Sequence, residues 1–254
     1  MIKFSVLGSG SCGNCYVFSC AGQAIMVDAG YSLRKIQTRM MEAGLELAAV
    51  QALLLTHLHP DHNSGAGVFA RKTGKPVYVS ENVLRYAKVE YDKMALPHDC
   101  KRNFEPGTGF EIGPFCINAF YSSHDSAGSV GFAISCEDKK IVLITDTGYY
   151  TEEMQNQAKT ADLLFLESNY DVQMLRTGPY PLYLQKRIAS QRGHLSNDQA
   201  REFLTSCEYE ISQKPVYLIH VSDSNNTPEL VASVMSPFNA QVCQRGCQYS
   251  GQLT

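Results

Sequence analysis

The residues best suited to chemistry lie in one short run, Thr56-His57-Leu58-His59-Pro60-Asp61-His62. Its three imidazoles and one carboxylate are ligands that zinc and related divalent ions accept. The apolar run 51–55 before it indicates a buried strand, and the small residues of 63–70 after it indicate the start of a helix. A histidine-rich surface loop without a metal is the alternative, but the internal position after a strand and the carboxylate argue against it.

The spacing inside this run predicts two metal sites rather than one. His57 and His59 are two positions apart on an extended segment, so their side chains can point the same way and chelate one ion. Asp61 and His62 enter the helix and point elsewhere, where they can serve a second ion. We therefore expect the loop to begin a two-metal centre.

Four more polar residues follow apolar strands, where α/β proteins tend to assemble their sites: Asp28, His124, Asp146 and His220. For Asp28 and Asp146 the alternative is that each carboxylate only caps the turn that follows its strand. Together with the loop, the four residues form a candidate constellation.

The elements that must position these residues alternate along the chain. The predicted strands are Ile2–Leu7, Cys15–Ser19, Ala24–Asp28, Ala52–Thr56, Pro76–Val79, Gly109–Ile112, Phe115–Phe120, Val130–Cys136, Lys140–Thr145, Leu163–Glu167 and Val216–His220. The predicted helices are Leu33–Ala43, Ser64–Lys72, Asn82–Lys93, Glu152–Lys159, Pro181–Gln191, Asn197–Cys207 and Pro228–Met235. Two such halves predict an α/β fold in which two mixed sheets pack face to face between outer helices, a four-layer αβ/βα sandwich.

Length and composition agree with a globular protein. A chain of 254 residues can bury a full core, and no linker divides it, so we expect a single domain over residues 1–254. The net charge of −3 gives no global attraction to nucleic acid or anionic lipid. No apolar run approaches a membrane span and the N-terminus does not read as a signal peptide, which predicts a cytoplasmic protein without a membrane partner.

The nine cysteines are scattered and odd in number, which favours reduced thiols. Cys12 and Cys15 form a C-x-x-C that could be a redox pair or half of a zinc site. No second such pair completes a four-sulfur site, so small residues in a glycine-rich turn are the favoured interpretation.

The Thr56–His62 run resembles the H-x-H-x-D-H signature of the metallo-β-lactamase superfamily, and the later His124, Asp146 and His220 follow in that superfamily's order. The resemblance implies the metallo-β-lactamase fold. It also implies that His57, His59 and His124 bind one metal, that Asp61, His62 and His220 bind the other, and that Asp146 bridges both.

Further motifs resemble the YycJ/WalJ exonuclease subfamily: residues 8–14, 167–171, 193–197 and 220–228. This resemblance implies 5′-to-3′ exonuclease activity on double-stranded DNA, with a hydroxide between the metals as nucleophile. Cys12 and Cys15 depart from the small or hydroxyl residues expected there. The polar residues expected to contact substrate are Asn169, Ser196, Ser222, Asn225 and Asn226.

Asp61 and His194 are the predicted catalytic residues. His194, in a glycine-led turn before a helix, is expected to donate a proton to the departing sugar oxygen, the alternative being a polar turn residue. Nearby basic residues could contact phosphates or form a solvated helix face, and two tyrosines, Tyr180 and Tyr183, could stack on bases or simply pack. The basic residues are Arg176, Lys186, Arg187, Arg192 and Arg201.

Two other functions remain open on the residues alone. The same ligands would serve a hydrolase of a small ester, thioester, lactone or cyclic phosphodiester, which needs neither the 193–197 turn nor the basic stretch. The third hypothesis is a non-catalytic metal sensor. It is disfavoured because a structural metal site fills its coordination shell with protein ligands and leaves no position for water. The expected cofactor is two divalent ions, zinc or manganese, with iron as a third choice. The expected partner is nucleic acid, DNA before RNA.

Overall fold

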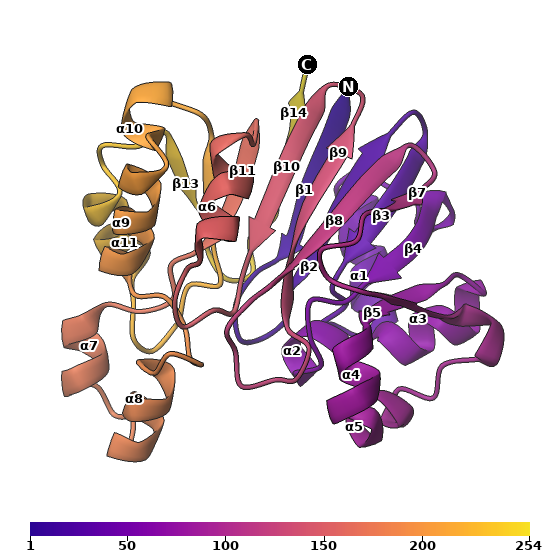
Figure 1. Ribbon diagram of the computed structural model, residues 1–254, viewed down its shortest axis with the longest axis horizontal. Helices are drawn as coiled ribbons and strands as arrows, with labels where there is room; N and C mark the ends of the chain where they lie inside the picture. The colour runs from indigo at the N-terminus through magenta and orange to yellow at the C-terminus, as the bar shows by residue number, and fades with distance from the viewer.

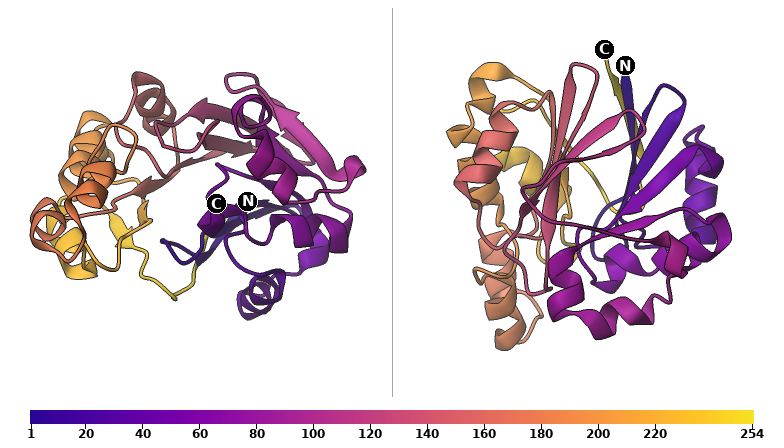
Figure 2. Two further views of the ribbon diagram at one scale, coloured as in Figure 1. Left: turned by 90° about the horizontal axis from the view of Figure 1, so that it is seen from below. Right: turned by 45° about the vertical axis from the view of Figure 1, so that its right-hand side comes forward.

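The computed structural model describes all residues 1–254 and contains two sheets of seven strands each, packed face to face with helices on both outer faces. Figures 1 and 2 show the four layers. The predicted α/β sandwich of two mixed sheets is confirmed.

The first sheet holds the N-terminal strands, and both ends of the chain lie in it. Its order is β14-β1-β2-β3-β4-β5-β6. The strands are β1 (Ile2–Gly8), β2 (Cys15–Cys20), β3 (Gln23–Val27), β4 (Val50–Leu54), β5 (Val77–Ser80), β6 (Lys101–Phe104) and β14 (Tyr249–Leu253). The helices in this half are α1 (Leu33–Glu42), α2 (Pro60–Asn63), α3 (Ala66–Thr73), α4 (Glu81–Tyr86) and α5 (Lys88–Lys93). Strands β3 to β6 run parallel, so their carboxyl ends meet at one edge.

The second sheet repeats this plan with the order β13-β12-β11-β10-β9-β8-β7. The strands are β7 (Phe110–Ile112), β8 (Phe115–Tyr121), β9 (Val130–Cys136), β10 (Lys139–Ile144), β11 (Leu163–Glu167), β12 (Val216–Ile219) and β13 (Ala240–Val242). The helices are α6 (Glu152–Lys159), α7 (Val172–Thr177), α8 (Leu182–Ile188), α9 (Asn197–Ser206), α10 (Tyr209–Ser212) and α11 (Pro228–Val234). Here β10 to β13 are the parallel strands.

Three apolar layers hold the sandwich together. Between the sheets, the rings of Phe4 and Phe18 pack edge-on against Phe165 at centroid distances of 5.5 and 5.8 Å. Outside the first sheet, Ile36 of α1 and Phe69 of α3 are fully buried, and Phe203 of α9 is fully buried outside the second. Burial of such large side chains contributes roughly 1.5–3 kcal/mol each, so the sheets form a rigid frame for the loops between them.

In both sheets, the carboxyl ends of the parallel strands lie at the same end of the sandwich. In Figure 1 this is the lower end, where α2 lies, whereas both termini lie at the upper end. Three residues within two positions of the ends of these strands have left-handed backbone angles: Asp28 (φ 60°), Asp146 (φ 50°) and His220 (φ 55°). This conformation is strained for a residue with a side chain and concentrates at functional sites, so the strand ends are the place to look for one.

The structure differs from the predicted elements in several places, since no prediction covers β6, α7 or α10. The helix expected over 82–93 is two short helices, because Ala87 has non-helical angles (φ −135°, ψ 35°) and ends the first one. The chain after Phe238 forms two edge strands, β13 and β14. The sequence does not predict them, because neither segment sustains the alternation of apolar and polar residues that is typical of a strand. None of the helices combines the length and apolar character needed to cross a lipid bilayer.

Candidate metal centre

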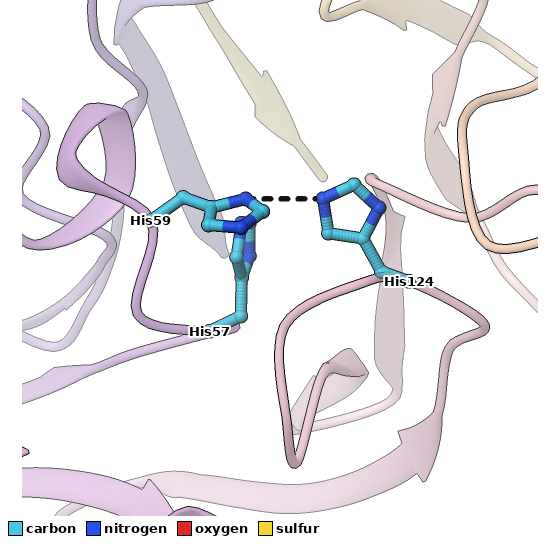
Figure 3. A group of neighbouring side chains, drawn as sticks. All are labelled: His57, His59 and His124. Carbon is cyan, nitrogen blue, oxygen red and sulfur yellow. Dashed lines mark hydrogen bonds between the residues drawn. The ribbon is translucent and has the colours of Figure 1, made fainter. Parts of the chain in front are cut away.

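Three histidines from two loops converge between the sheets and are called group one: His57, His59 and His124. Figure 3 shows His59 and His124 facing each other, with His59 Nδ1 and His124 Nε2 3.2 Å apart. The His57 ring lies 4.7 Å from the His59 ring and 5.0 Å from the His124 ring between centroids. Each imidazole offers one nitrogen within 4.8 Å of the others, which is close enough for one ion to be shared.

Group two lies beside group one and consists of Asp61, His62 and His220. Asp61 Oδ2 is 3.6 Å from His62 Nε2 and 3.5 Å from His220 Nε2. Asp61 and His62 lie on α2, which Pro60 starts at its first turn. The strand-to-helix turn therefore sends its four polar side chains to two neighbouring groups.

Asp146 lies between the two groups. Its Oδ2 is 3.3 Å from His62 Nε2, and its Oδ1 is 3.6 Å from His124 Nε2 and 3.5 Å from His220 Nε2. The structure thus brings together all seven side chains that the sequence singled out as ligands.

The donor atoms of group one fit a metal ion. His57 Nε2 is buried and has no hydrogen-bond partner, although an unpaired buried polar atom normally costs about 1–3 kcal/mol. Burial lowers the pKa of His57 well below its usual value, and burial also lowers the pKa values of His59 and His124. Neutral imidazoles with free lone pairs are the form in which histidine binds metals.

Group two fits a cation for a different reason, which is its excess of negative charge. Burial acts to lower the pKa of His62, but Asp146 and Asp28 outweigh it and raise that pKa to about 9. The pKa of His220 is likewise raised well above its usual value, because Asp146, Asp61 and Glu167 outweigh burial. Asp61 and the carboxylates around group two therefore attract positive charge, which a divalent cation would supply in place of protons.

Asp28 supports this centre from behind rather than capping its own turn. Its Oδ2 pairs with His62 Nδ1 at 2.7 Å, and its Oδ1 accepts a hydrogen bond from the Thr56 backbone N–H at 2.8 Å. Both side chains of the Asp28–His62 pair are fully buried. Asp28 therefore orients the imidazole whose other nitrogen faces Asp61 and Asp146.

Glu167 belongs to the motif 167–171, but the sequence predicts no role for it. Glu167 ends β11 fully buried, and its Oε1 is 2.6 Å from His194 Nδ1 and 3.3 Å from His220 Nδ1. Burial acts to raise its pKa, but His194 and His220 outweigh burial and lower it. The position, a carboxylate at the carboxyl end of a parallel strand, is the signal that could have identified it.

His194 lies at the rim of the centre, as expected for a residue that meets substrate. Its ring stacks on His220 at a centroid distance of 5.3 Å and an interplanar angle of 15°. Its Nδ1 is also 3.6 Å from Asp146 Oδ1, and its side chain is 18% exposed.

The five residues expected to contact substrate are all buried. Asn169 donates to the His220 carbonyl at 2.8 Å, and Ser196 caps α9 in a capping box with Gln199. Asn226 donates to the carbonyls of Ser168 and Asn169, so it holds the loops behind the centre. Ser222 accepts from the Asn225 backbone N–H, while neither side-chain polar atom of Asn225 has a partner. A direct contact of these residues with substrate stays a prediction.

The basic stretch reaches the centre at two points. Arg187 donates from Nε to Asp125 Oδ2, and Arg192 Nε donates to the His124 carbonyl at 3.3 Å. Arg176 and Lys186 line a pocket between α7, α8 and the start of α9. The Tyr183 side chain is 75% exposed on α8, which buries no residue. Asp125, which follows His124, was missed because nothing in its local sequence distinguishes it.

The glycine-rich turn after β1 serves the centre through Asn14 rather than through its cysteines. Cys12 is exposed and Cys15 is buried in β2, and all nine cysteines are unpaired. Asn14 Nδ2 is 3.0 Å from His62 Nε2. The φ angles of Gly10 (114°) and Gly13 (142°) exclude other residues from this turn.

A known family matches this geometry. The model described as "Beta-lactamase superfamily domain" matches residues 23–221, which include every side chain of groups one and two. The chain belongs to the beta-lactamase superfamily. Within it, the chain is 35% identical over 233 residues to the exodeoxyribonuclease WalJ of Streptococcus pneumoniae, covering 92% of this chain and 86% of that protein. It is 36% identical over 235 residues to the exodeoxyribonuclease YycJ of Bacillus anthracis, covering 92% and 88%. The predicted family is confirmed.

Two solved structures share the fold across nearly the whole chain. The metallo-β-lactamase fold protein YhfI of Bacillus subtilis superimposes with a TM-score of 0.73 at 18% identity, covering 98% of this chain and 99% of that one. Zinc-bound PqqB of Methylobacterium extorquens gives 0.71 at 18% identity, covering 97% and 99%. The architecture is thus that of the superfamily from end to end.

Proposed function

We propose that this protein is a metal-dependent exodeoxyribonuclease that degrades double-stranded DNA from the 5′ end in the cytoplasm. The observation that carries the proposal is that 92% of the chain aligns with proteins named exodeoxyribonuclease, in a fold where seven histidine and aspartate side chains converge. Residues 1–254 act as one catalytic domain, a view supported by the pairing of β14 with β1, which joins both chain ends in one sheet.

The cofactor is a pair of divalent ions, zinc or manganese, with iron as a third choice. Group one would hold the first ion, group two the second, and Asp146 would contact both. When bound, such ions increase the acidity of water and neutralise the charge that develops on a phosphodiester. The Nε2 atoms of His57 and His220 support this assignment, because each is buried without a hydrogen-bond partner.

The chain's own residues would move the protons. The side chain of Asp61 is 22% exposed, against 3% for Asp146, and is placed to accept a proton from the attacking water. Nδ1 of His194 is 2.6 Å from Glu167 Oε1, so Nε2 is the atom left to face substrate. In its imidazolium form His194 would pass the Nε2 proton to the departing sugar oxygen and become neutral, with the remaining proton on Nδ1 toward Glu167. Glu167 keeps the imidazole in this orientation.

Nucleic acid suits the surroundings better than a small ester does. The helices beside the centre carry the basic residues Arg176 and Lys186 and the exposed Tyr183, which can contact phosphates and stack on a base. A small ester hydrolase needs neither feature.

The test is digestion of a linear duplex labelled at one 5′ end, with protein loaded separately with manganese and with zinc. Short labelled products from the 5′ end, absent with Asp146→Ala, would support the proposal. Labelled products that shorten from the 3′ end would reverse the polarity. A duplex left intact with every metal would overturn the proposal, and RNA and small esters would be assayed next.

A further inference from the structure

The carboxylate of Asp125 lies beside two histidines of group one. Its Oδ1 lies 3.4 Å from His59 Nε2 and 3.5 Å from His124 Nε2. This oxygen is buried and has no hydrogen-bond partner. The other oxygen, Oδ2, accepts a hydrogen bond from Arg187 Nε. One carboxylate thus joins helix α8 to two histidines of the candidate metal centre.

The orientation of His59 defines what Asp125 can do. His59 Nδ1 faces His124 Nε2 at 3.2 Å, which is close enough for both nitrogens to bind one ion. With Nδ1 committed as a ligand atom, the proton of the neutral imidazole must reside on Nε2, which is the atom next to Asp125 Oδ1. A carboxylate in this place selects the metal-binding tautomer and limits rotation of the ring.

Arg187 keeps the carboxylate in place. It lies on α8, a helix without buried residues, and its side chain is 55% exposed. The groups that face Asp125 are therefore two imidazoles from the loops after β4 and β8 and one guanidinium from α8.

We propose that Asp125 is a positioning residue for the first metal site, acting through His59 and held by Arg187. The inference rests on the proposed metal centre and extends it, because it connects metal affinity to a helix that lies outside both ligand groups. Loss of Asp125 lowers the affinity of the first site and leaves the second site nearly unchanged.

The experiment measures the binding of Zn²⁺ and of Mn²⁺ to metal-free protein by competition with a chelator. Asp125→Ala is expected to weaken one of the two ions 10- to 100-fold, the usual effect of removing a partner of a ligand. Asp125→Asn keeps an acceptor oxygen and is expected to bind this ion with nearly the wild-type affinity. Arg187→Ala is expected to have an affinity between those of the alanine and asparagine variants of Asp125. The matched control is Asp223→Ala, which removes an exposed aspartate paired with Arg245.

Urea unfolding of the metal-free proteins separates positioning from a general loss of stability, because the expected loss of affinity comes without a loss of folding. Wild-type affinity at both sites in Asp125→Ala and Arg187→Ala would overturn the inference. Equal losses in the alanine and asparagine variants would overturn it as well, since Asp125 would then be a ligand itself. A wild-type protein that binds no divalent ion would overturn the proposed metal centre along with it.

Discussion

Asp28 and His62 form a completely buried pair, with Asp28 Oδ2 2.7 Å from His62 Nδ1 and neither side chain exposed. Asp28 also accepts hydrogen bonds from the backbone and the hydroxyl of Thr56, the residue that starts the loop from His57 to His62. The pair ties the end of β3 to α2, so it bears on the stability of the chain as well as on the orientation of His62, a proposed metal ligand.

Asp28→Ala is expected to lower the free energy of unfolding by about 3 kcal/mol, because breaking a buried charged pair leaves its partner without compensation. Urea denaturation of metal-free protein measures this. Asp223→Ala serves as the exposed comparison and should cost under about 1 kcal/mol. Equal losses of unfolding free energy in the two variants would show that the buried pair stabilises the fold no more than an exposed pair does.

His194→Ala is expected to lower kcat about 10²- to 10⁴-fold while the metal content stays unchanged, since the variant loses a proton donor and no ligand. Steady-state digestion of the duplex, with metal analysis of the same sample, measures both quantities. A variant with full metal content and full kcat would exclude His194 as the donor.

Glu167→Gln should reduce kcat through His194, because the two side chains are 2.6 Å apart. The double variant Glu167→Gln/His194→Ala is therefore expected to be no slower than His194→Ala alone, whereas independent residues would have additive effects. The kcat values of the wild type, the two single variants and the double variant are measured. Additive effects would show that Glu167 does not act through His194.

Removal of the ions should destabilise the folded state without unfolding it. Three apolar layers hold the frame, so chelated protein is expected to keep its secondary structure while its Tm falls. Ligand at about 1,000 times its Kd contributes about 4 kcal/mol. Circular dichroism during heating, with and without chelator, tests this, and unchanged Tm values would argue against tight binding.

The thiols should differ sharply in reactivity at pH 8. Burial raises the pKa of Cys15, and burial with the neighbouring Cys20 raises the pKa of Cys136 to about 12, so both stay protonated and protected. Native protein is expected to take up alkylating label at the three exposed cysteines, Cys12, Cys116 and Cys247. Mass spectrometry counts the labels, and the denatured protein should take up nine. Rapid labelling of Cys15 in native protein would contradict the structure.

The sequence by itself determined the layers and the local part of the centre. Apolar strands alternate with amphipathic helices along the chain, and the loop from His57 to His62 needs only its own backbone to send side chains in two directions. The resemblance then extended the ligand set to His124, Asp146 and His220, which the folded chain brings to the loop.

Only the tertiary structure decided which residues support that set. Glu167 meets His194 across 27 positions and Asp125 meets Arg187 across 62, and no local periodicity encodes such distances. The edge strands β13 and β14 form because neighbouring strands offer free backbone groups, whatever their side chains. Asn226, polar and next to a candidate ligand loop, is committed to backbone carbonyls. Local sequence determines which way a side chain can point, whereas packing of distant segments determines what it meets.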